Sequence, residues 1–243
     1  MTVGASSTAG AHAYGDPAYW DQRYRQDPGP FDWYQKYKTL APLLDLYLRR
    51  SHRLLLVGCG NSELGEHMIA DGYQDVVNID ISSVVVEAMQ KKYQDKPQLK
   101  YIKMDVRDMN SFEDGSFDAI IDKGTLDSLM CGQNAQHNAT KMLEEVGRVL
   151  KDKGVYILIT YGDPSYRLHL LRDLHLWNIH VHVIDRMEKS SEQKTWELTR
   201  PLPLNEDGSS VAAIIGANNE VHYIYVCIKE KSLRQDQNEG VEH

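Results

Sequence analysis

A short apolar run that ends at two closely spaced glycines limits the folds that are open to this chain. The run covers residues 53–57, and Gly58, Cys59 and Gly60 follow it directly. A short apolar run bounded by turn residues is typical of a strand buried on both faces of a parallel sheet. Glycine has no Cβ atom, so Gly58 and Gly60 let the backbone turn sharply and approach a ligand closely. Because a helical pattern follows, this stretch predicts the strand, loop and helix of a nucleotide-binding βαβ unit.

An acidic residue at the end of the next predicted strand indicates which kind of ligand the βαβ unit binds. Asp71 and Gly72 end the helical pattern, and residues 76–80 form a second apolar run that finishes at Asp80. Asp80 lies about 20 residues beyond the loop, where nucleotide-binding folds place the carboxylate that accepts hydrogen bonds from ribose hydroxyls. A glycine loop alone also fits a purely structural turn, so it is the joint pattern that favours an adenosine-type ligand.

Predicted strands and helices alternate through most of the chain. The strands are expected at residues 53–57, 76–80, 99–104, 117–121, 155–161, 180–184 and 222–228. The helices are expected at residues 39–50, 62–71, 84–89, 135–150 and 164–174. This alternation predicts an α/β fold with a doubly wound, mostly parallel seven-stranded sheet. No clear helix separates the last two strands, with a loop or hairpin at residues 205–210, which predicts an antiparallel hairpin at the sheet edge.

Polar features stand at the carboxyl ends of four predicted strands. They are Gly58, Asp80, Asp105 and the pair Asp122 and Lys123. In open α/β sheets, ligands bind outside the carboxyl ends of the strands. The recurrence of such features at four strand ends therefore predicts one ligand site along this edge of the sheet.

Two of the predicted helices begin beside residues that favour N-caps. Asn61 or Ser62 is the expected cap of the helix that follows the glycine loop, and Ser82 or Ser83 is the expected cap of the next helix. Both caps also lie close to the predicted ligand edge.

A high density of aromatic side chains precedes the first predicted strand. These side chains are Tyr19, Trp20, Tyr24, Phe31, Trp33, Tyr34 and Tyr37. The helix-breaking residues 27–30 divide them into two groups. Two interpretations stay open, an aromatic lid over a ligand and an amphipathic helix packed on the domain.

The domain organisation is expected to be simple. Residues 1–17 are predicted to form a flexible arm, residues 18–230 one domain, and residues 231–243 a mobile charged tail. Within the domain, residues 18–50 are expected to supply the aromatic lid and a helix.

Composition argues against several classes of function. The net charge of −8 argues against broad binding to nucleic acid or anionic lipid, and it is compatible with a basic protein partner. No stretch approaches the roughly 20 apolar residues of a membrane helix. The small, polar first residues do not form a secretory leader, so a cytoplasmic location is expected.

The cysteines and histidines do not predict a metal centre. Cys59, Cys131 and Cys227 are widely separated and odd in number, which gives no disulfide framework or zinc spacing. His180 and His182 share one face of a predicted strand, but no third ligand is evident. Cys59 has no obvious base beside it and is interpreted as a small loop residue.

Residues 57–62, Asp80, and Asp105 with Val106 together resemble the sequence motifs of the seven-strand class of S-adenosylmethionine-dependent methyltransferases. The resemblance covers nearly the whole chain. In that family these positions hold the glycine loop, the ribose-binding acid and the acidic position that recognises adenine. The resemblance implies S-adenosyl-L-methionine as cofactor and S-adenosyl-L-homocysteine as product.

A narrower resemblance involves four further stretches. Residues 19–24, 31–34, 82–86 and 122–127 are similar to the motifs of the methyltransferase-like group that contains elongation-factor 1A lysine methyltransferases. The cofactor-binding residues that the resemblance implies are Trp20, Tyr24, Trp33, Gly58, Cys59, Gly60, Asp80, Ile81, Asp105, Val106 and Lys123.

The chemistry of this class suggests roles for the polar residues after the fourth strand. A lysine acceptor must lose a proton before transfer, which is costly at neutral pH because its pKa is near 10.4. Asp122, Lys123 and Asp127 are the candidate catalytic residues, with Asp122 or Asp127 orienting the amine or relaying a proton. The alternative is structural: Asp122 or Asp127 caps a helix, and Lys123 pairs with Asp122.

The resemblance thus implies a methyltransferase, with protein-lysine methylation as the leading hypothesis and elongation factor 1A as the candidate acceptor. A small-molecule methyltransferase and a cofactor-binding scaffold without activity are the alternatives. A nicotinamide dehydrogenase is disfavoured, because Glu63 stands where the dehydrogenase fingerprint needs glycine or alanine.

Overall fold

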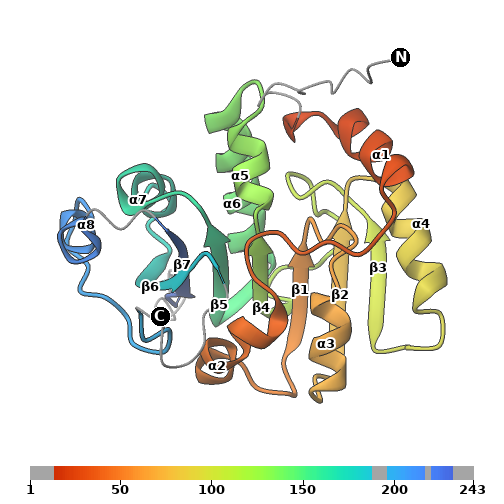
Figure 1. The fold of residues 1–243 in the computed structure, drawn as a ribbon, viewed down its shortest axis with the longest axis horizontal. Coiled ribbons are helices and arrows are strands. Elements are labelled where there is room, and N and C mark those ends of the chain that lie inside the picture. The colour runs from red at the N-terminus through yellow and green to blue at the C-terminus, as the bar shows by residue number, and fades with distance from the viewer. Residues whose placement is uncertain (1–13, 188–195, 217–219, 232–243) are drawn as a thin grey trace, which may run out of the picture.

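The structure is a computed structural model that describes residues 14–187, 196–216 and 220–231 (Figure 1). The predicted tail, apart from residue 231, and the first 13 residues of the predicted arm lie outside the described residues.

One seven-stranded sheet forms the centre of the molecule, with the strand order β3-β2-β1-β4-β5-β7-β6. The strands are β1 (Arg53–Val57), β2 (Asp75–Asp80), β3 (Leu99–Lys103), β4 (Phe117–Lys123), β5 (Leu150–Thr160), β6 (Trp177–Asp185) and β7 (Val221–Lys229). Strands β1 to β5 are parallel to one another, whereas β7 pairs antiparallel with both β5 and β6. The predicted mostly parallel sheet with an antiparallel edge pair is confirmed.

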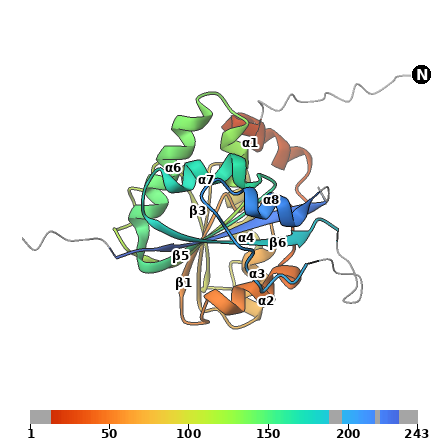
Figure 2. The ribbon, with the colours of Figure 1, turned by 90° about the vertical axis from the view of Figure 1, so that its left-hand side faces the viewer.

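Eight helices are described around this sheet. They are α1 (Pro17–Gln26), α2 (Tyr37–Tyr47), α3 (Leu64–Ala70), α4 (Ser83–Lys92), α5 (Thr125–Met130), α6 (Ala135–Val149), α7 (Pro164–Arg172) and α8 (Ser209–Ile215). One core joins α2, α3 and α4 to one face of the sheet, and a second core joins α5 to α8 to the other. Figure 2 shows α2 and α6 on opposite sides of the strands. Among the described residues, no helix is long and apolar enough to cross a bilayer.

Burial of β1 on both faces explains its apolar sequence. Leu54 and Leu56 pack in the core of α2 to α4, and Leu55 and Val57 pack in the opposite core. Val57 is in register with the residue before Asp80 on β2, and with Asp122 on β4. The glycine loop therefore begins beside the carboxyl ends of two neighbouring strands.

The helix caps agree only partly with the sequence. Ser82 caps α4, because its hydroxyl accepts the Val85 N–H, as predicted. The N-cap of α3 is Glu63 rather than Asn61 or Ser62. The Ser62 hydroxyl still accepts the Leu64 N–H at 3.1 Å.

Between β6 and β7 the prediction of a loop or hairpin at residues 205–210 is incomplete. Helix α8 begins at Ser209 and packs Val211 and Ile215 into the core. The antiparallel pairing of β6 with β7 is correct, but a helix lies between the two strands in the sequence. Its seven residues are too few for helical periodicity to stand out.

The last residues of the predicted arm belong to the folded domain. Tyr14 and Gly15 form a short 3₁₀ turn, and Asp16 caps α1. The Trp20 indole N–H donates to the Tyr14 carbonyl at 2.9 Å. The aromatic segment is thus tied down several residues before the predicted boundary at residue 17.

Candidate functional site

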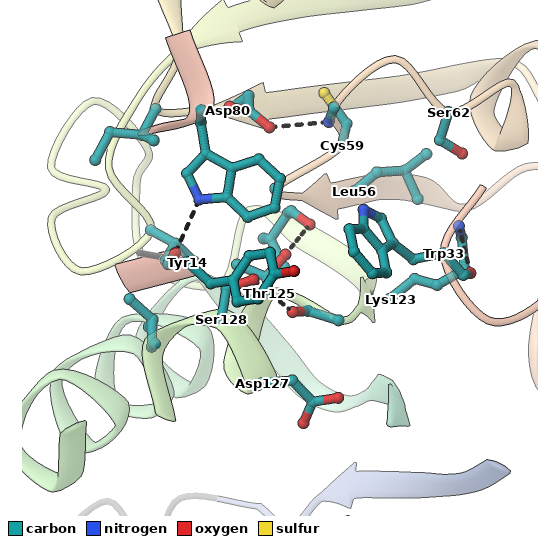
Figure 3. Close-up of a pocket in the computed structure, with 18 of the residues that line it drawn as sticks. Tyr14, Trp33, Leu56, Cys59, Ser62, Asp80, Lys123, Thr125, Asp127 and Ser128 are labelled. Atoms are coloured by element: carbon teal, nitrogen blue, oxygen red, sulfur yellow. Dashed lines mark hydrogen bonds between the residues drawn. The ribbon is translucent and has the colours of Figure 1, made fainter. Parts of the chain in front are cut away.

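A cavity of about 370 Å³ lies at the carboxyl ends of β1 to β5, next to α1 and the segment that joins α1 to α2 (Figure 3). This volume is within the roughly 300–1,000 Å³ that is typical of small-molecule sites. The predicted site residues that line it are Trp20, Tyr24, Trp33, Gly58, Cys59, Gly60, Asp80, Ile81, Asp105, Val106, Lys123 and Asp127. Asp122 is not among the lining residues.

The glycine loop forms one wall of the cavity. Gly58 and Gly60 have φ angles of +57° and +51°, in the left-handed region that favours glycine. A Cβ atom on Gly58 would lie 2.0 Å from Thr125 Oγ1, and one on Gly60 would lie 2.6 Å from the Tyr24 hydroxyl. Between them, burial raises the pKa of the Cys59 thiol well above its ordinary value, which keeps it protonated. Both glycines are therefore required by backbone conformation and by space.

Asp80 presents a fixed and buried carboxyl group at the cavity wall. Its Oδ2 accepts the Gly60 N–H and its Oδ1 accepts the Ser82 N–H, both at 2.9 Å. Burial raises the pKa of Asp80 to about 6, although these hydrogen bonds oppose the shift. No cation in the described part of the chain pairs with Asp80. A buried carboxylate of this kind favours additional hydrogen-bond donors, such as ligand hydroxyls.

Asp105 is held by a side chain that the sequence did not suggest. Arg107 Nη2 donates to Asp105 Oδ2 at 2.6 Å, and Arg107 Nε donates to Asp105 Oδ1 at 3.0 Å. Burial alone would raise the pKa of Asp105, but the hydrogen bonds from Arg107 outweigh it and lower the pKa. Val106 is 7% exposed and adds an apolar contact beside this pair.

Lys123 connects the aromatic segment to the floor of the cavity. Its ammonium group donates to Asp32 Oδ1 and to the Trp33 carbonyl, each at 3.0 Å. The Ser62 hydroxyl donates to the same Asp32 carboxylate. Burial lowers the pKa of Lys123, and the charge of Asp32 opposes that shift. The predicted alternative in which Lys123 pairs with Asp122 is wrong.

The aromatic segment both packs on the domain and lines the cavity. Trp20 stacks on Tyr24 with ring centroids 5.9 Å apart, and its edge contact with Trp33 spans 6.4 Å. Tyr24 and Tyr37 belong to the core of α2 to α4, and Trp20, Tyr24 and Trp33 line the cavity. The two interpretations of the sequence therefore both apply to this segment, and Tyr24 serves in both ways.

Asp122 is a structural residue in this fold. It is fully buried, and its carboxylate accepts the N–H groups of Thr125 and Leu126 at the start of α5. The Tyr156 hydroxyl also donates to it at 3.0 Å. Burial, reinforced by the charge of Asp127, raises the pKa of Asp122 to about 7. With this carboxylate enclosed by three donors, the arrangement corresponds to the helix-capping alternative.

Asp122→Ala is expected to lower the free energy of unfolding by about 2 kcal/mol, because two helix N–H groups and a buried hydroxyl lose their acceptor. Urea denaturation checks this value. Asp114→Ala is the control, because Asp114 has a side chain that is 82% exposed and pairs with Arg148, and it should change stability by less than about 0.5 kcal/mol. Equal stability losses for the two variants would contradict the capping role.

Asp127 lies at the far end of the cavity from Asp80, and Figure 3 shows the two side chains well apart. Its Oδ1 accepts from Thr160 Oγ1 at 2.5 Å and from Arg167 Nη2 at 2.6 Å. Its Oδ2 accepts from the Tyr34 hydroxyl at 2.7 Å. The side chains of Asp127 and Arg167 are each 4% exposed. Both carboxylate oxygens of Asp127 are therefore occupied by hydrogen-bond donors of the protein.

Several lining residues were missed by the sequence analysis as members of the site. They include Tyr14, Tyr34, Arg107, Thr125 and Tyr161. Tyr34 lies in the quoted aromatic motif, and Tyr161 ends the predicted fifth strand, so their positions carried a usable signal. The role of Arg107 depends on a contact that no sequence spacing specifies.

The walls of the cavity fit S-adenosylmethionine. The ends of β2 and β3 carry carboxyl groups that accept hydrogen bonds, which suits ribose and adenine. At the glycine loop, side chains of Thr125 and Tyr24 leave no room for a Cβ atom, so bare backbone forms this wall of the cavity. Aromatic faces on the opposite side suit a sulfonium cation. The cavity thus brings together hydrogen-bond acceptors, the exposed backbone of the glycine loop and aromatic rings.

Comparisons with known proteins agree with this geometry. A family model described as a methyltransferase domain matches residues 55–158. EEF1A lysine methyltransferase 4 of Bos taurus is 37% identical over 177 residues, which cover 68% of this chain and 69% of that protein. The eEF1A lysine and N-terminal methyltransferase of Homo sapiens is 36% identical over 181 residues, or 70% of this chain and 25% of that protein.

A solved structure shares the fold. A TehB-like SAM-dependent methyltransferase from Corynebacterium glutamicum covers 89% of this chain and 100% of its own length, with a TM-score of 0.51 and 16% identity. At that identity the likeness extends to the fold alone, whereas the bovine relative matches two thirds of both chains at more than twice the identity. The chain belongs to the seven-strand S-adenosylmethionine-dependent methyltransferases, in the group of relatives named eEF1A lysine methyltransferases.

Proposed function

We propose that this chain transfers methyl groups to a lysine side chain of a protein, and that elongation factor 1A is this protein. The observation that carries the proposal is a single cavity that joins an adenosine-type end to an open aromatic end. The names of the relatives, eEF1A lysine methyltransferases, supply the candidate acceptor.

The order of the strands divides the cavity into a cofactor end and an acceptor end. The ends of β2 and β3 carry Asp80 and the Asp105–Arg107 pair, on one side of the glycine loop. The ends of β4 and β5 lie on the other side of β1 and lead to Asp127 and Tyr161. A ligand held on the β2 side therefore points toward residues of the β4 and β5 ends.

The chain's own residues suggest how the cofactor would be held. Asp80 would accept hydrogen bonds from the ribose, and Val106 would contact the adenine. Backbone N–H groups of the glycine loop and the Lys123–Asp32 pair would bind the charged methionine end. Trp20 and Trp33 would face the sulfonium. When bound, S-adenosylmethionine supplies an activated methyl group for an in-line displacement and leaves as S-adenosylhomocysteine.

The remaining chemical task is to present a neutral amine. Desolvation lowers the pKa of a lysine, and so does a neighbouring positive charge. The acceptor end is lined by aromatic rings. Asp127, its one carboxylate among the described residues, is already paired with Arg167. Burial there would favour the neutral amine, and alignment would supply most of the acceleration.

Exposed tyrosines beside the acceptor end suit a protein partner. Tyr161 is 46% exposed at the end of β5, and Tyr166 is 65% exposed on the first turn of α7. Tyrosine is enriched in protein interfaces because it supplies a large contact area at a low entropy cost. Tyr166 lies outside the lining of the cavity, so a small substrate bound within the cavity would have no reason to contact it.

Tyr166→Ala is expected to raise KM for elongation factor 1A about tenfold while the Kd of the cofactor stays unchanged, since interface tyrosines contribute on this scale. Steady-state kinetics and calorimetry measure the two constants. Leu46→Ala is the control, because Leu46 is 57% exposed on α2, away from the cavity. Unchanged KM in both variants would argue against a protein docking surface here.

The function itself is tested by incubating the purified chain with tritiated S-adenosylmethionine and a cell lysate. The expected result is one labelled protein band that is identified as elongation factor 1A. Label in metabolites alone would indicate a small-molecule methyltransferase. Tight cofactor binding without any transfer would indicate a scaffold, and either outcome would overturn the proposal.

A further inference from the structure

Building on the proposed function, we infer that the hydroxyl of Tyr34 receives and orients the amine of the substrate lysine at the acceptor end of the cavity. The residue comes from the aromatic segment between α1 and α2, yet it reaches the ends of β4 and β5. The inference rests on where this hydroxyl lies, where its proton is directed, and what surrounds its ring.

The position of Tyr34 is tightly determined. Its backbone has a φ angle of +62°, which is unusual for a residue with a bulky side chain. Its ring packs over Gly124, where a Cβ atom would lie 3.1 Å from Tyr34 Cε2. The ring centroid lies 4.8 Å from that of His222 and 6.4 Å from that of Tyr161. A strained backbone conformation of this kind persists only where packing and hydrogen bonds of the surrounding structure hold it, and such conformations are common at functional sites.

The hydrogen-bond network fixes the direction of the Tyr34 proton. The hydroxyl donates to Asp127 Oδ2 at 2.7 Å, and the same carboxylate forms a buried salt bridge with Arg167. The other Asp127 oxygen is occupied by Thr160 and Arg167. Asp127 therefore has little capacity left for an amine, whereas the phenol oxygen keeps its lone pairs.

This arrangement makes the phenol oxygen a strong acceptor. A hydrogen bond to a charged carboxylate polarises the donor and strengthens the bonds that its oxygen can accept. Burial and the charge of Asp127 also raise the pKa of Tyr34, so the hydroxyl stays neutral. An amine N–H that donates to this oxygen would have its nitrogen lone pair free for the methyl group. The proton that the ammonium must lose goes to solvent, and Tyr34 forms no covalent bond.

The hydroxyls of Thr125 and Ser128 also line the cavity, but their surroundings differ. The Thr125 hydroxyl donates to the Val57 carbonyl, and the Ser128 hydroxyl donates to the Gly124 carbonyl. Neither hydroxyl donates to a charged group, so neither oxygen is polarised as the hydroxyl oxygen of Tyr34 is. Their bonds serve the strand end and helix α5, respectively.

Tyr34→Phe is expected to lower kcat on elongation factor 1A by about 10- to 100-fold, which corresponds to the loss of one hydrogen bond from a polarised acceptor. The ring and its packing are kept. The KM for elongation factor 1A and the Kd of the cofactor should stay within about threefold of wild type, because the contacts that set them lie elsewhere. Kinetics at saturating cofactor and calorimetry separate these constants.

Tyr47→Phe is the matched control. Its hydroxyl contacts the His182 imidazole at 2.8 Å, and Tyr47 is not among the residues that line the cavity. A comparable loss of a hydroxyl there should change the free energy of unfolding without changing kcat.

The outcomes separate this inference from the proposed function. If wild type methylates elongation factor 1A and Tyr34→Phe keeps a kcat within twofold, the role of Tyr34 is excluded and the function stands. If wild type binds the cofactor but methylates no protein lysine, both the function and this inference are overturned. A fall in kcat that comes with a cofactor Kd weakened by the same factor would place Tyr34 in cofactor binding instead.

Discussion

Replacing Gly58 by arginine is expected to abolish cofactor binding, with a dissociation constant raised by about 1,000-fold or more. A Cβ atom alone would lie 2.0 Å from Thr125 Oγ1, and the φ angle of +57° disfavours any side chain. The longer side chain must then enter the cavity or displace the loop. Calorimetric titration with S-adenosylmethionine measures the effect, and methyl transfer should be lost in parallel.

Gly115→Arg is the control that separates damage to the cofactor site from the backbone strain that any side chain causes at a positive φ angle. Gly115 has a φ angle of +60°, but the nearest heavy atom to its Cβ position is Lys151 Cα at 3.8 Å. Both variants carry the left-handed penalty of roughly 1–2 kcal/mol in stability. The Gly115 variant should bind the cofactor normally. Normal binding by Gly58→Arg would show that the cofactor lies elsewhere.

The substitution Asp80→Asn is expected to weaken the affinity for the cofactor by about 100-fold at pH 7.5. The amide cannot accept at both atoms, so one contact to Gly60 or Ser82 is lost together with the charge. Hydrogen bonds to a charged group contribute about 1.5–3 kcal/mol, which supports this magnitude. Calorimetry at pH 7.5 measures the difference, and a Kd within threefold of wild type would contradict the assignment of Asp80.

The pH dependence of stability and of cofactor affinity tests the same role of Asp80. The pKa of Asp80 is raised to about 6, so the folded protein without cofactor binds this proton more tightly than the unfolded chain does. Its contribution to stability is present at low pH and is lost as the pH rises through about 6. Cofactor hydroxyls prefer the ionised form, so affinity should fall as the pH drops below about 6. Asp80→Asn should lack this dependence, and an unchanged pH profile would count against the carboxylate.

The sheet and the cofactor end could be predicted because their signals are local. The run before Gly58 is buried on both faces, so its sequence is continuously apolar. Asp80 follows from its distance to the loop, and the parallel order brings both to one edge.

The rest of the site depends on contacts between distant parts of the chain. Lys123 pairs with Asp32, 91 residues away, and Tyr34 donates to Asp127, 93 residues away. Such contacts leave no periodicity in the sequence. An acidic residue near the end of β4 suits catalysis and capping equally well in the sequence. At Asp122 the hydrogen bonds from the N–H groups of the following helix show the capping contact.

We propose that this cavity delivers a methyl group to a lysine of elongation factor 1A. The most direct measurement is mass spectrometry of purified, unmethylated elongation factor 1A after incubation with the chain and S-adenosylmethionine. The expected result is the added mass of methyl groups on one lysine-containing peptide, and this mass should be absent when Gly58→Arg replaces the wild type. An unmodified elongation factor after incubation with a chain that demonstrably binds the cofactor would contradict it.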